Sequence, residues 1–240
     1  MEEKLSLWDH LDDFRSCLIK MLLAIGCGFC VALACYARVF QWLTPAEGPP
    51  LYLFSPLDGI SVTIKLCFWV GLAVSSPIWC FFLFEFLSPG LNIKEKRVFI
   101  PFFTLSSLFF FGGMAFAHYV TIPLANGYLL ALNNQIGQNL WSLSAYIDYA
   151  LLLYLANGIA FESCLILLFL VHFGICTAPF MVQKRKPVII SIFVISALLT
   201  PPDVVTQLLM ALPLLLIYEG AIIYSRLKAP LFSVEAKTSN

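Results

Sequence analysis

Long apolar segments constrain this chain more than any other feature of its sequence. A helix of about 20 apolar residues crosses the hydrocarbon core of a bilayer, which is about 30 Å thick. Four segments reach that length, and two more are joined only by the stretch 200–203. The pattern predicts an all-α integral membrane protein with six transmembrane helices. The six segments are 17–37, 62–86, 99–123, 149–173, 187–200 and 204–224.

The composition argues against a soluble fold. The chain of 240 residues is 60% hydrophobic and 12% charged, whereas soluble domains carry about 25% charged residues. Its 22 Phe and nine Tyr are too many to be buried in a soluble globule of this size. The surplus must face lipid, which argues against a soluble enzyme.

The basic residues lie almost entirely on one side of the predicted membrane. Of the 14 Lys and Arg, 11 fall on the side of the two termini, and only Arg38 lies in an opposite loop. Loops rich in Lys and Arg stay in the cytoplasm, so both termini are predicted to be cytoplasmic. The segments 38–61, rich in Pro and Gly, and 124–148 are then external loops. The 11 residues are Lys4, Arg15, Lys94, Lys96, Arg97, Lys184, Arg185, Lys186, Arg226, Lys228 and Lys237.

The fifth and sixth spans are short. The fifth has an apolar run of 14 residues, which rises about 21 Å at about 1.5 Å per residue. A segment of this length is either re-entrant or lies where the bilayer is thinner, and the basic cluster at 184–186 favours a short true span. We expect one membrane domain over 1–228 and a short disordered cytoplasmic tail over 229–240.

Glu162 lies near the middle of the fourth span. A charge at that depth costs about 2.5–3.5 kcal/mol, so Glu162 is expected to face the bundle interior, a water-filled cavity or a partner. Gly158, one turn earlier on the same face, permits close approach of another helix. Glu162 is either a functional group or a protonated side chain hydrogen-bonded between helices. Glu219 is a weaker case of the same pattern, and Glu85 lies close enough to an interface to reach water.

Asp203 follows two prolines and directly precedes a helix. Asp is a preferred N-cap residue, so a capping role is the simplest interpretation. Gln207 lies one turn later on the same face, and the polar pair could instead hold a partner helix. The residues alone favour the cap.

Glu95 lies in the basic segment 94–97, nine residues after Phe86. With Asn92 as an N-cap it is the third residue of a capping box, a purely structural role. A carboxylate fixed beside an aromatic ring also suits an arginine, which pairs bidentately with the one and stacks on the other. Both interpretations stay open on the residues alone.

Patterns for catalysis and metal binding are lacking in the sequence. His10, His118 and His172 are dispersed without ligand spacing, and neither a Gly-rich phosphate loop nor a G-x-S-x-G elbow occurs. Basic clusters of three residues are too small for nucleic-acid binding. We therefore predict no enzyme activity, no catalytic or metal site, no cofactor and no nucleic-acid partner.

Six motifs, in order along the chain, resemble the TatC family, the multi-spanning receptor subunit of the twin-arginine (Sec-independent) protein translocase. The resemblance covers about residues 8–226, nearly the whole chain. Each motif is weak alone, but six in order with matching topology are highly specific. They are His10-Leu11-Asp12-Asp13-Phe14-Arg15; Ser76-Pro77 through Phe86 with Pro89-Gly90-Leu91; Glu95-Lys96-Arg97; Phe111-Gly112 with Phe116 and Pro123; Gly158 with Phe161-Glu162; and Thr200-Pro201-Pro202-Asp203 with Gln207, Pro213 and Tyr218-Glu219.

The resemblance implies a signal-peptide receptor and translocation core in the cytoplasmic (inner) membrane of a bacterium. Such a protein binds paired arginines on the signal peptide of a folded cargo protein and uses the proton-motive force for export. Carried over to this sequence, Glu95 and Asp13 would pair with the arginines, Phe86 would border the site, and Arg15 would brace the N-terminal helix. Asp13 departs from the family, which usually has the longer Glu at this place.

The resemblance also implies membrane partners. Single-span subunits of the TatA and TatB type would join the receptor, which would self-associate in a larger complex. Glu162 would be the polar group of an intramembrane face, and Asp203, Gln207 and Glu219 would contact partner spans. The alternative function is a proton-coupled secondary transporter of small solutes that uses Glu162, although the inverted repeats typical of such transporters are not visible.

Overall fold

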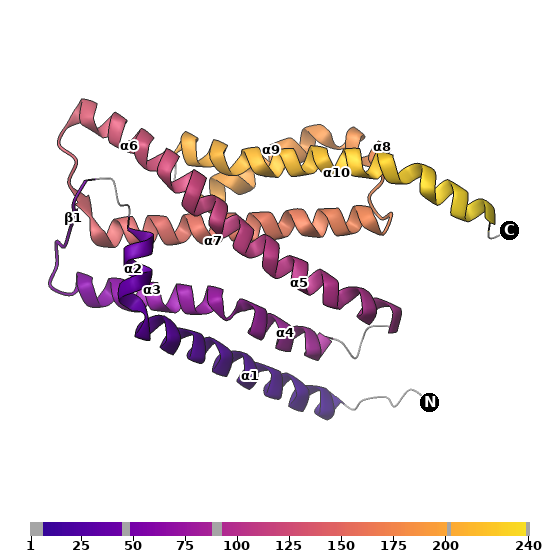
Figure 1. The fold of residues 1–240 in the computed structure, drawn as a ribbon, viewed down its shortest axis with the longest axis horizontal. Helices are drawn as coiled ribbons and strands as arrows, with labels where there is room; N and C mark the ends of the chain where they lie inside the picture. The colour runs from indigo at the N-terminus through magenta and orange to yellow at the C-terminus, as the bar shows by residue number, and fades with distance from the viewer. Residues whose placement is uncertain (1–6, 45–48, 88–92, 201–202, 239–240) are drawn as a thin grey trace. The chain divides into compact units, whose positions relative to one another are not determined.

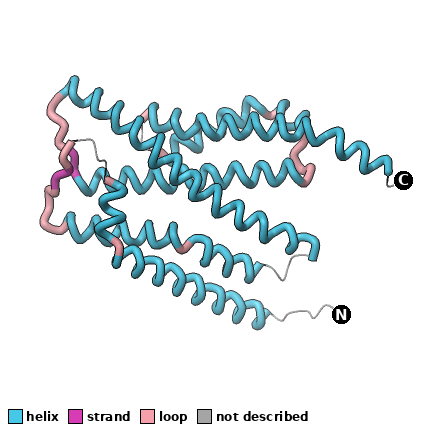
Figure 2. Tube along the Cα trace, in the orientation of Figure 1, coloured by secondary structure: helices cyan, strands magenta, loops and turns pink. Residues whose placement is uncertain are grey.

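The computed structural model describes the backbone of residues 7–44, 49–87, 93–200 and 203–238. It describes the side chains of residues 11–44, 49–86, 101–200 and 203–228. Nearly all of this described chain is helical (Figure 1, Figure 2), as the sequence predicts. The chain forms two compact units, unit 1 (1–107 and 140–151) and unit 2 (108–139 and 152–240), and each is described by itself.

The elements follow one another as helices with two very short strands. Their bounds are α1 (Leu7–Ala34), α2 (Tyr36–Leu43), β1 (Leu51–Tyr52), α3 (Asp58–Val74), α4 (Ser76–Leu87), α5 (Ile93–Phe116), the π-helix η2 (Ala117–Thr121), α6 (Ile122–Ile136), β2 (Trp141–Ser142), α7 (Leu143–His172), α8 (Ala178–Gln183), α9 (Arg185–Leu199) and α10 (Val204–Thr238).

In unit 1, α1 packs along α3 and α4 (Figure 1). The closest approach is between two glycines. A Cβ atom added to Gly28 would lie 2.5 Å from the Gly71 carbonyl oxygen, and one added to Gly71 would lie 2.6 Å from the Phe29 nitrogen. Small residues let helices in lipid approach backbone to backbone, so glycine at both positions sets the α1–α3 distance.

A bend of 54° separates α3 from α4. Pro77 has no N–H to donate to the carbonyl one turn earlier, which interrupts the helix. Ser75 Oγ and Trp79 Nε1 both donate to the Leu72 carbonyl, at 3.3 and 3.1 Å, so the bend carries its own hydrogen bonds, as backbone in lipid requires. The sequence predicted one span over 62–86, and the structure divides it at Ser75.

The described parts of the segment 38–61, residues 38–44 and 49–61, are more regular than the predicted loop. They include most of α2, whose Leu43 is buried, and the strand β1. β1 pairs in parallel with β2, with Leu51 opposite Trp141. The Tyr146 hydroxyl, from the first turns of α7, donates to the Leu43 carbonyl at 3.3 Å. Contacts across the sequence therefore order a segment whose Pro and Gly content suggested irregular structure.

In unit 2, η2 leads into α6, which continues to Ile136. The sequence predicted the third span to end at Pro123 and a loop over 124–148. That loop is wrong, because 124–136 is helical and α7 already begins at Leu143. Pro123 is the second residue of α6, and a proline in the first helical turn needs no hydrogen-bond donor. The π-turn before it lets the helix pass the proline without a break.

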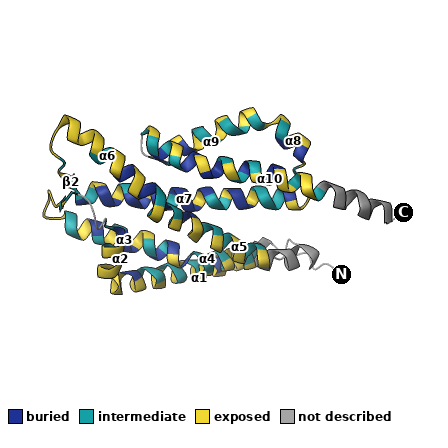
Figure 3. Ribbon diagram, turned by 45° about the horizontal axis from the view of Figure 1, so that its top comes forward, coloured by how far each residue is buried: buried dark blue, intermediate teal, exposed yellow. Residues whose placement is uncertain are grey.

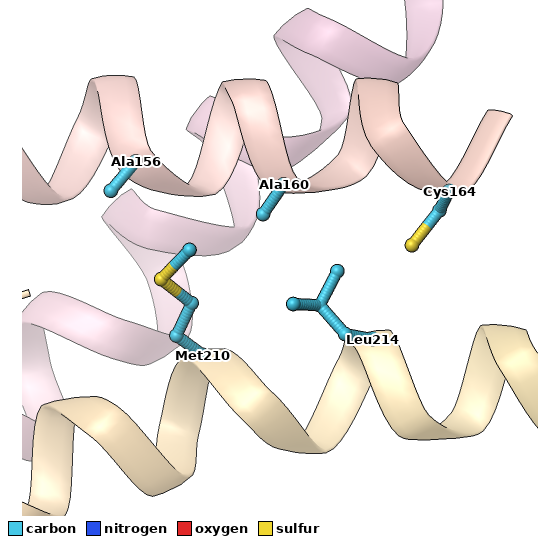
Figure 4. Packing of buried hydrophobic residues seen from close by; sticks show 5 residues of the cluster. All are labelled: Ala156, Ala160, Cys164, Met210 and Leu214. Atoms are coloured by element: carbon cyan, nitrogen blue, oxygen red, sulfur yellow. The ribbon is translucent and has the colours of Figure 1, made fainter. Parts of the chain in front are cut away.

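The core of unit 2 lies between α7 and α10. Ala156, Ala160 and Cys164 recur at every fourth residue of α7 and meet Met210 and Leu214 of α10 (Figure 4). These residues are nearly inaccessible, and Figure 3 shows the buried side chains of unit 2 concentrated on α7 and α10. Small side chains on α7 permit the close packing of the two helices.

Four helical stretches are long and apolar enough to cross a membrane. They are Leu11–Ala34, Pro101–Ile136, Leu143–His172 and Val204–Lys228, and the bent pair α3–α4 makes a fifth. The predicted fifth span corresponds to α9, whose 15 residues rise about 22 Å. That length falls short of a hydrocarbon core of about 30 Å. The protein is thus an all-helical membrane protein with four or five candidate spans in its described residues.

The glycine contact between α1 and α3 predicts an asymmetry between two glycines of α1. Gly28→Ala places a methyl group against the Gly71 carbonyl and should lower the free energy of unfolding by about 1–3 kcal/mol, as overpacking does. Gly26→Ala is the matched control, because a Cβ there meets nothing within 4 Å. Thermal unfolding in detergent measures both variants. Equal unfolding temperatures would contradict the close approach.

Candidate functional site

The first candidate site lies where the N-terminal part of α1 meets the end of α4. The rings of Phe14 and Phe86 make an edge contact, with centroids 5.6 Å apart and planes at 60°. Asp13 and Arg15 flank Phe14 on α1, and both side chains are exposed. Three of the four residues expected to bind a signal peptide (Asp13, Arg15 and Phe86) therefore lie in one part of unit 1.

Helical spacing explains how the two elements meet. Phe14, Cys17 and Met21 recur at three and four residues on α1, as Phe82, Glu85 and Phe86 do on α4, so each set forms one face. Cys17 is buried, and its thiol donates to the Phe82 carbonyl at 3.3 Å. This contact fixes α1 against α4 next to the exposed Phe14 ring and the half-buried Phe86 ring.

An ion pair continues the same contact. Lys20 Nζ lies 3.3 Å from Glu85 Oε2 and 5.6 Å from the centroid of the Phe82 ring. The two side chains are about half exposed. The sequence offered no sign of this pair, because its members are 65 residues apart and lie on different predicted spans.

Glu95 is the fourth expected binding residue. It is the third residue of α5, which begins at Ile93. Its side chain lies outside the described residues, as does the whole of Asn92. The two interpretations of Glu95 therefore stay predictions.

The second candidate site surrounds Glu162 on α7, within unit 2. Glu162 is half-buried, and Phe161 beside it packs on Phe116, with ring centroids 5.6 Å apart. One turn earlier, a Cβ on Gly113 would lie 2.4 Å from the Asn157 carbonyl oxygen, and one on Gly158 would lie 2.8 Å from the Phe110 ring. The close approach of another helix expected at Gly158 is present, with the Phe110 ring filling the space that a side chain would need.

Two polar features near Glu162 were not found from the sequence. Asn157 is fully buried, and its Nδ2 donates to the Leu153 carbonyl at 2.9 Å while its Oδ1 has no partner in the described part of the chain. His118, in η2, lies 2.6 Å from the Tyr154 hydroxyl. An Asn in the middle of a predicted span could have been recognised in the sequence. The His–Tyr pair could not, because it joins residues 36 positions apart.

The third candidate group is the start of α10. Asp203 Oδ1 accepts a hydrogen bond from the Thr206 backbone N–H at 2.8 Å, and its other oxygen accepts one from the Thr206 hydroxyl. The predicted N-cap is thus confirmed. Gln207 Nε2 donates to the Phe193 carbonyl of α9 at 3.0 Å. Both polar side chains bind within the α9–α10 hairpin.

Glu219 also has a partner within the chain. Its Oε2 lies 2.5 Å from Arg185 Nη2 at the start of α9. Next to it, the buried Tyr218 hydroxyl donates to the Met181 carbonyl of α8 at 2.8 Å. These two contacts fasten α8 and α9 to α10 at the end of the hairpin remote from Asp203.

The described residues hold no group of three or more His, Cys, Asp or Glu that could bind a metal ion. The candidate sites are instead carboxylates beside aromatic rings or amides. Such groups can pair with cations and with the polar side chains of other helices.

Comparison with known proteins gives consistent results. Residues 9–213 match the family model TatC, Sec-independent protein translocase protein. The Sec-independent protein translocase protein TatC of Desulforapulum autotrophicum is 33% identical over 231 residues, which are 94% of this chain and 86% of that protein. TatC of Escherichia coli strain K12 is 31% identical over 94% of this chain and 90% of its own length.

A solved structure has the same fold. The crystal structure of the twin arginine translocase receptor TatC in DDM superimposes with a TM-score of 0.75 and 35% sequence identity. The match covers 90% of this chain and 99% of that chain.

Because Asp203 caps α10, the stability of the protein should depend on whether the residue that replaces it can still accept a hydrogen bond. Asp203→Ala removes the acceptor for the Thr206 N–H and should lower the free energy of unfolding by about 1 kcal/mol. Asp203→Asn is the matched control, since its amide oxygen still caps the helix without the charge. Thermal unfolding in detergent compares the two, and an Asn variant as unstable as the Ala variant would contradict the cap.

Proposed function

This chain belongs to the TatC family of Sec-independent protein translocase proteins, and from that premise we propose where and how it binds its signal peptides. It is a multi-pass membrane protein, a twin-arginine translocase receptor subunit and not an enzyme. The family assignment also replaces the alternative of a small-solute transporter.

We propose that twin-arginine signal peptides bind at the N-terminal part of α1 and the end of α4. The observation that supports this most is the contact between Phe86 and Phe14, whose neighbours in sequence, Asp13 and Arg15, are exposed. A guanidinium pairs bidentately with a carboxylate and stacks on an aromatic face, which an ammonium does less well. Asp13 and Glu95 supply the carboxylates, Phe86 supplies the ring, and Arg15 braces α1.

This site would face the cytoplasm. The chain has six spans in this proposal, with α3–α4 as the second, α9 as the short fifth, and both termini in the cytoplasm of a bacterial cell. The asymmetry of Lys and Arg supports this orientation. The membrane would thin around α9, because its 15 residues do not reach across a core of about 30 Å.

Glu162 would act after the signal peptide has bound. A half-buried carboxylate in a span is costly and calls for a polar partner or water. The buried Asn157, one turn away with an acceptor to spare, adds polarity to the same stretch of α7. We assign Glu162 to the transport step that the proton-motive force drives, not to signal recognition.

The α9–α10 hairpin, which contains Asp203, Gln207 and Glu219, would bind single-span subunits of the TatA and TatB type. All three residues form hydrogen bonds or ion pairs within the chain. We therefore assign them the role of holding the hairpin in a shape on which a partner helix can dock. Self-association in a larger complex would follow from the same membrane-facing surfaces.

The signal-peptide site is tested by photo-crosslinking a twin-arginine signal peptide to membranes that contain this protein. Glu95→Ala should reduce crosslinking about tenfold or more, because a hydrogen-bonded charge pair contributes about 1.5–3 kcal/mol. A peptide with two lysines in place of the arginines serves as the control ligand. Equal crosslinking of both peptides, or an unchanged yield with Glu95→Ala, would refute the site.

The role of Glu162 is tested by separating binding from export. Glu162→Ala should impair export of a folded cargo protein while crosslinking to the signal peptide stays near the original level. Glu162→Gln is the matched variant, because it keeps hydrogen-bonding capacity but cannot ionise. If Glu162→Ala lowers the thermal unfolding temperature and Glu162→Gln exports normally, the residue is structural.

A further inference from the structure

We propose that Glu85 is an additional carboxylate of the signal-peptide site, and that Lys20 occupies it until an arginine of the signal peptide takes its place. The inference rests on the function proposed above. It concerns a pair of residues, Lys20 and Glu85, that none of the six motifs places in the site.

The pair lies directly beside the site. Going along the α1–α4 contact, Phe14 meets Phe86, Cys17 meets the Phe82 carbonyl, and Lys20 meets Glu85. Glu85 is the neighbour of Phe86 in sequence, and both belong to the face of α4 that lies against α1. Lys20 Nζ lies 3.3 Å from Glu85 Oε2 and 5.6 Å from the Phe82 ring centroid, so a guanidinium in the place of this ammonium would pair with Glu85 and lie against the Phe82 ring.

Lys20 reaches this position from deeper in α1. It lies six residues beyond Phe14, which is about 9 Å along a helix. α1 and α4 run in opposite directions here, since residues 14 and 17 meet 86 and 82. The long side chain of Lys20 nevertheless reaches back past Phe82 to Glu85, as lysine side chains do when their charge seeks a polar region.

The contact is weak for an ion pair. Lys20 Nζ touches one carboxylate oxygen, Oε2, at 3.3 Å, and the side chains of Lys20 and Glu85 are 46% and 55% exposed. The other oxygen, Oε1, has no partner among the described residues. Exposed pairs of this kind contribute little to stability, so the cost of separating Lys20 from Glu85 is small.

An arginine from outside would bind Glu85 better than Lys20 does. Its guanidinium can donate to both carboxylate oxygens at once and lie flat against Phe86 or Phe82. A lysine of the peptide would only replace the single ammonium–carboxylate contact of Lys20 with another contact of the same kind. The exchange therefore favours arginine over lysine, and it adds a third carboxylate to a site whose Asp13 is shorter than the usual Glu.

Binding of a fluorescent twin-arginine peptide to the purified full chain in detergent tests the exchange by anisotropy. Lys20→Met should tighten binding about two- to fivefold, because the competing cation is gone. Glu85→Gln should weaken binding about two- to fivefold, because the carboxylate is gone. The double variant should bind like Glu85→Gln. A bridge that only holds α1 to α4 would shift both single variants in the same direction, and that result would overturn the proposal.

A second variant separates exchange from folding. Lys20→Arg keeps the ion pair but gives the internal cation the bidentate geometry, so it should weaken peptide binding without lowering the unfolding temperature. Tighter or unchanged binding with Lys20→Arg would contradict the exchange. The matched control is a second ion pair in the described part of unit 1, Lys65–Asp148, at 2.9 Å and similar exposure. Lys65→Met and Asp148→Asn should leave the affinity unchanged.

The outcomes distinguish this inference from the function it rests on. If the protein prefers the twin-arginine peptide to the twin-lysine peptide, and Glu95→Gln weakens binding while the Lys20 and Glu85 variants do not, only the exchange is wrong. If the two peptides bind equally to the unmodified chain, the proposed site itself is wrong.

Discussion

Backbone polar groups in lipid have no water to bond, and the rest of this structure depends on how the chain satisfies them. Long α-helices do so by themselves, which is why apolar segments become helices. The exceptions are the places where proline removes a donor. At Pro77 the chain bends, and two side chains donate to the Leu72 carbonyl. At Pro123 a π-turn precedes the proline, and the helix continues to Ile136.

The bend at Ser75 has a consequence for the receptor site. On the N-terminal side of the bend, Gly28 and Gly71 hold α1 and α3 at a fixed distance. On its C-terminal side, α4 leads to the face formed by Phe82, Glu85 and Phe86. There side chains of α1 contact α4, and two of them, Phe14 and Lys20, are exposed. Unit 1 thus combines a tightly packed part with an accessible end, which is what a site for an extended peptide requires.

The sequence predicted the class of fold because hydrophobic length and charge position are local properties. It also predicted the cap at Asp203, since a cap depends on residues three positions apart. It placed the third helix end at Pro123, although proline in a first turn is compatible with a helix. The ion pairs Lys20–Glu85 and Arg185–Glu219 could not be predicted, because each joins helices far apart in sequence and no residue pattern specifies which faces meet. Asn157 is recognisable as an amide in an apolar run, but only packing reveals that its Oδ1 atom has no partner among the described residues.

Polar groups with unused bonding capacity are the ones that can change partners. Both oxygens of Asp203 are engaged by Thr206, and Gln207 Nε2 is engaged by the Phe193 carbonyl, so a ligand that took over these groups would have to break the start of α10. Among the described residues, Glu85 has a single weak bond on one oxygen and no bond on the other. A receptor must bind and release, which requires contacts that exchange at small cost. This criterion supports the proposed recognition site at the α1–α4 contact, and it supports a role of the α9–α10 hairpin that depends on its shape.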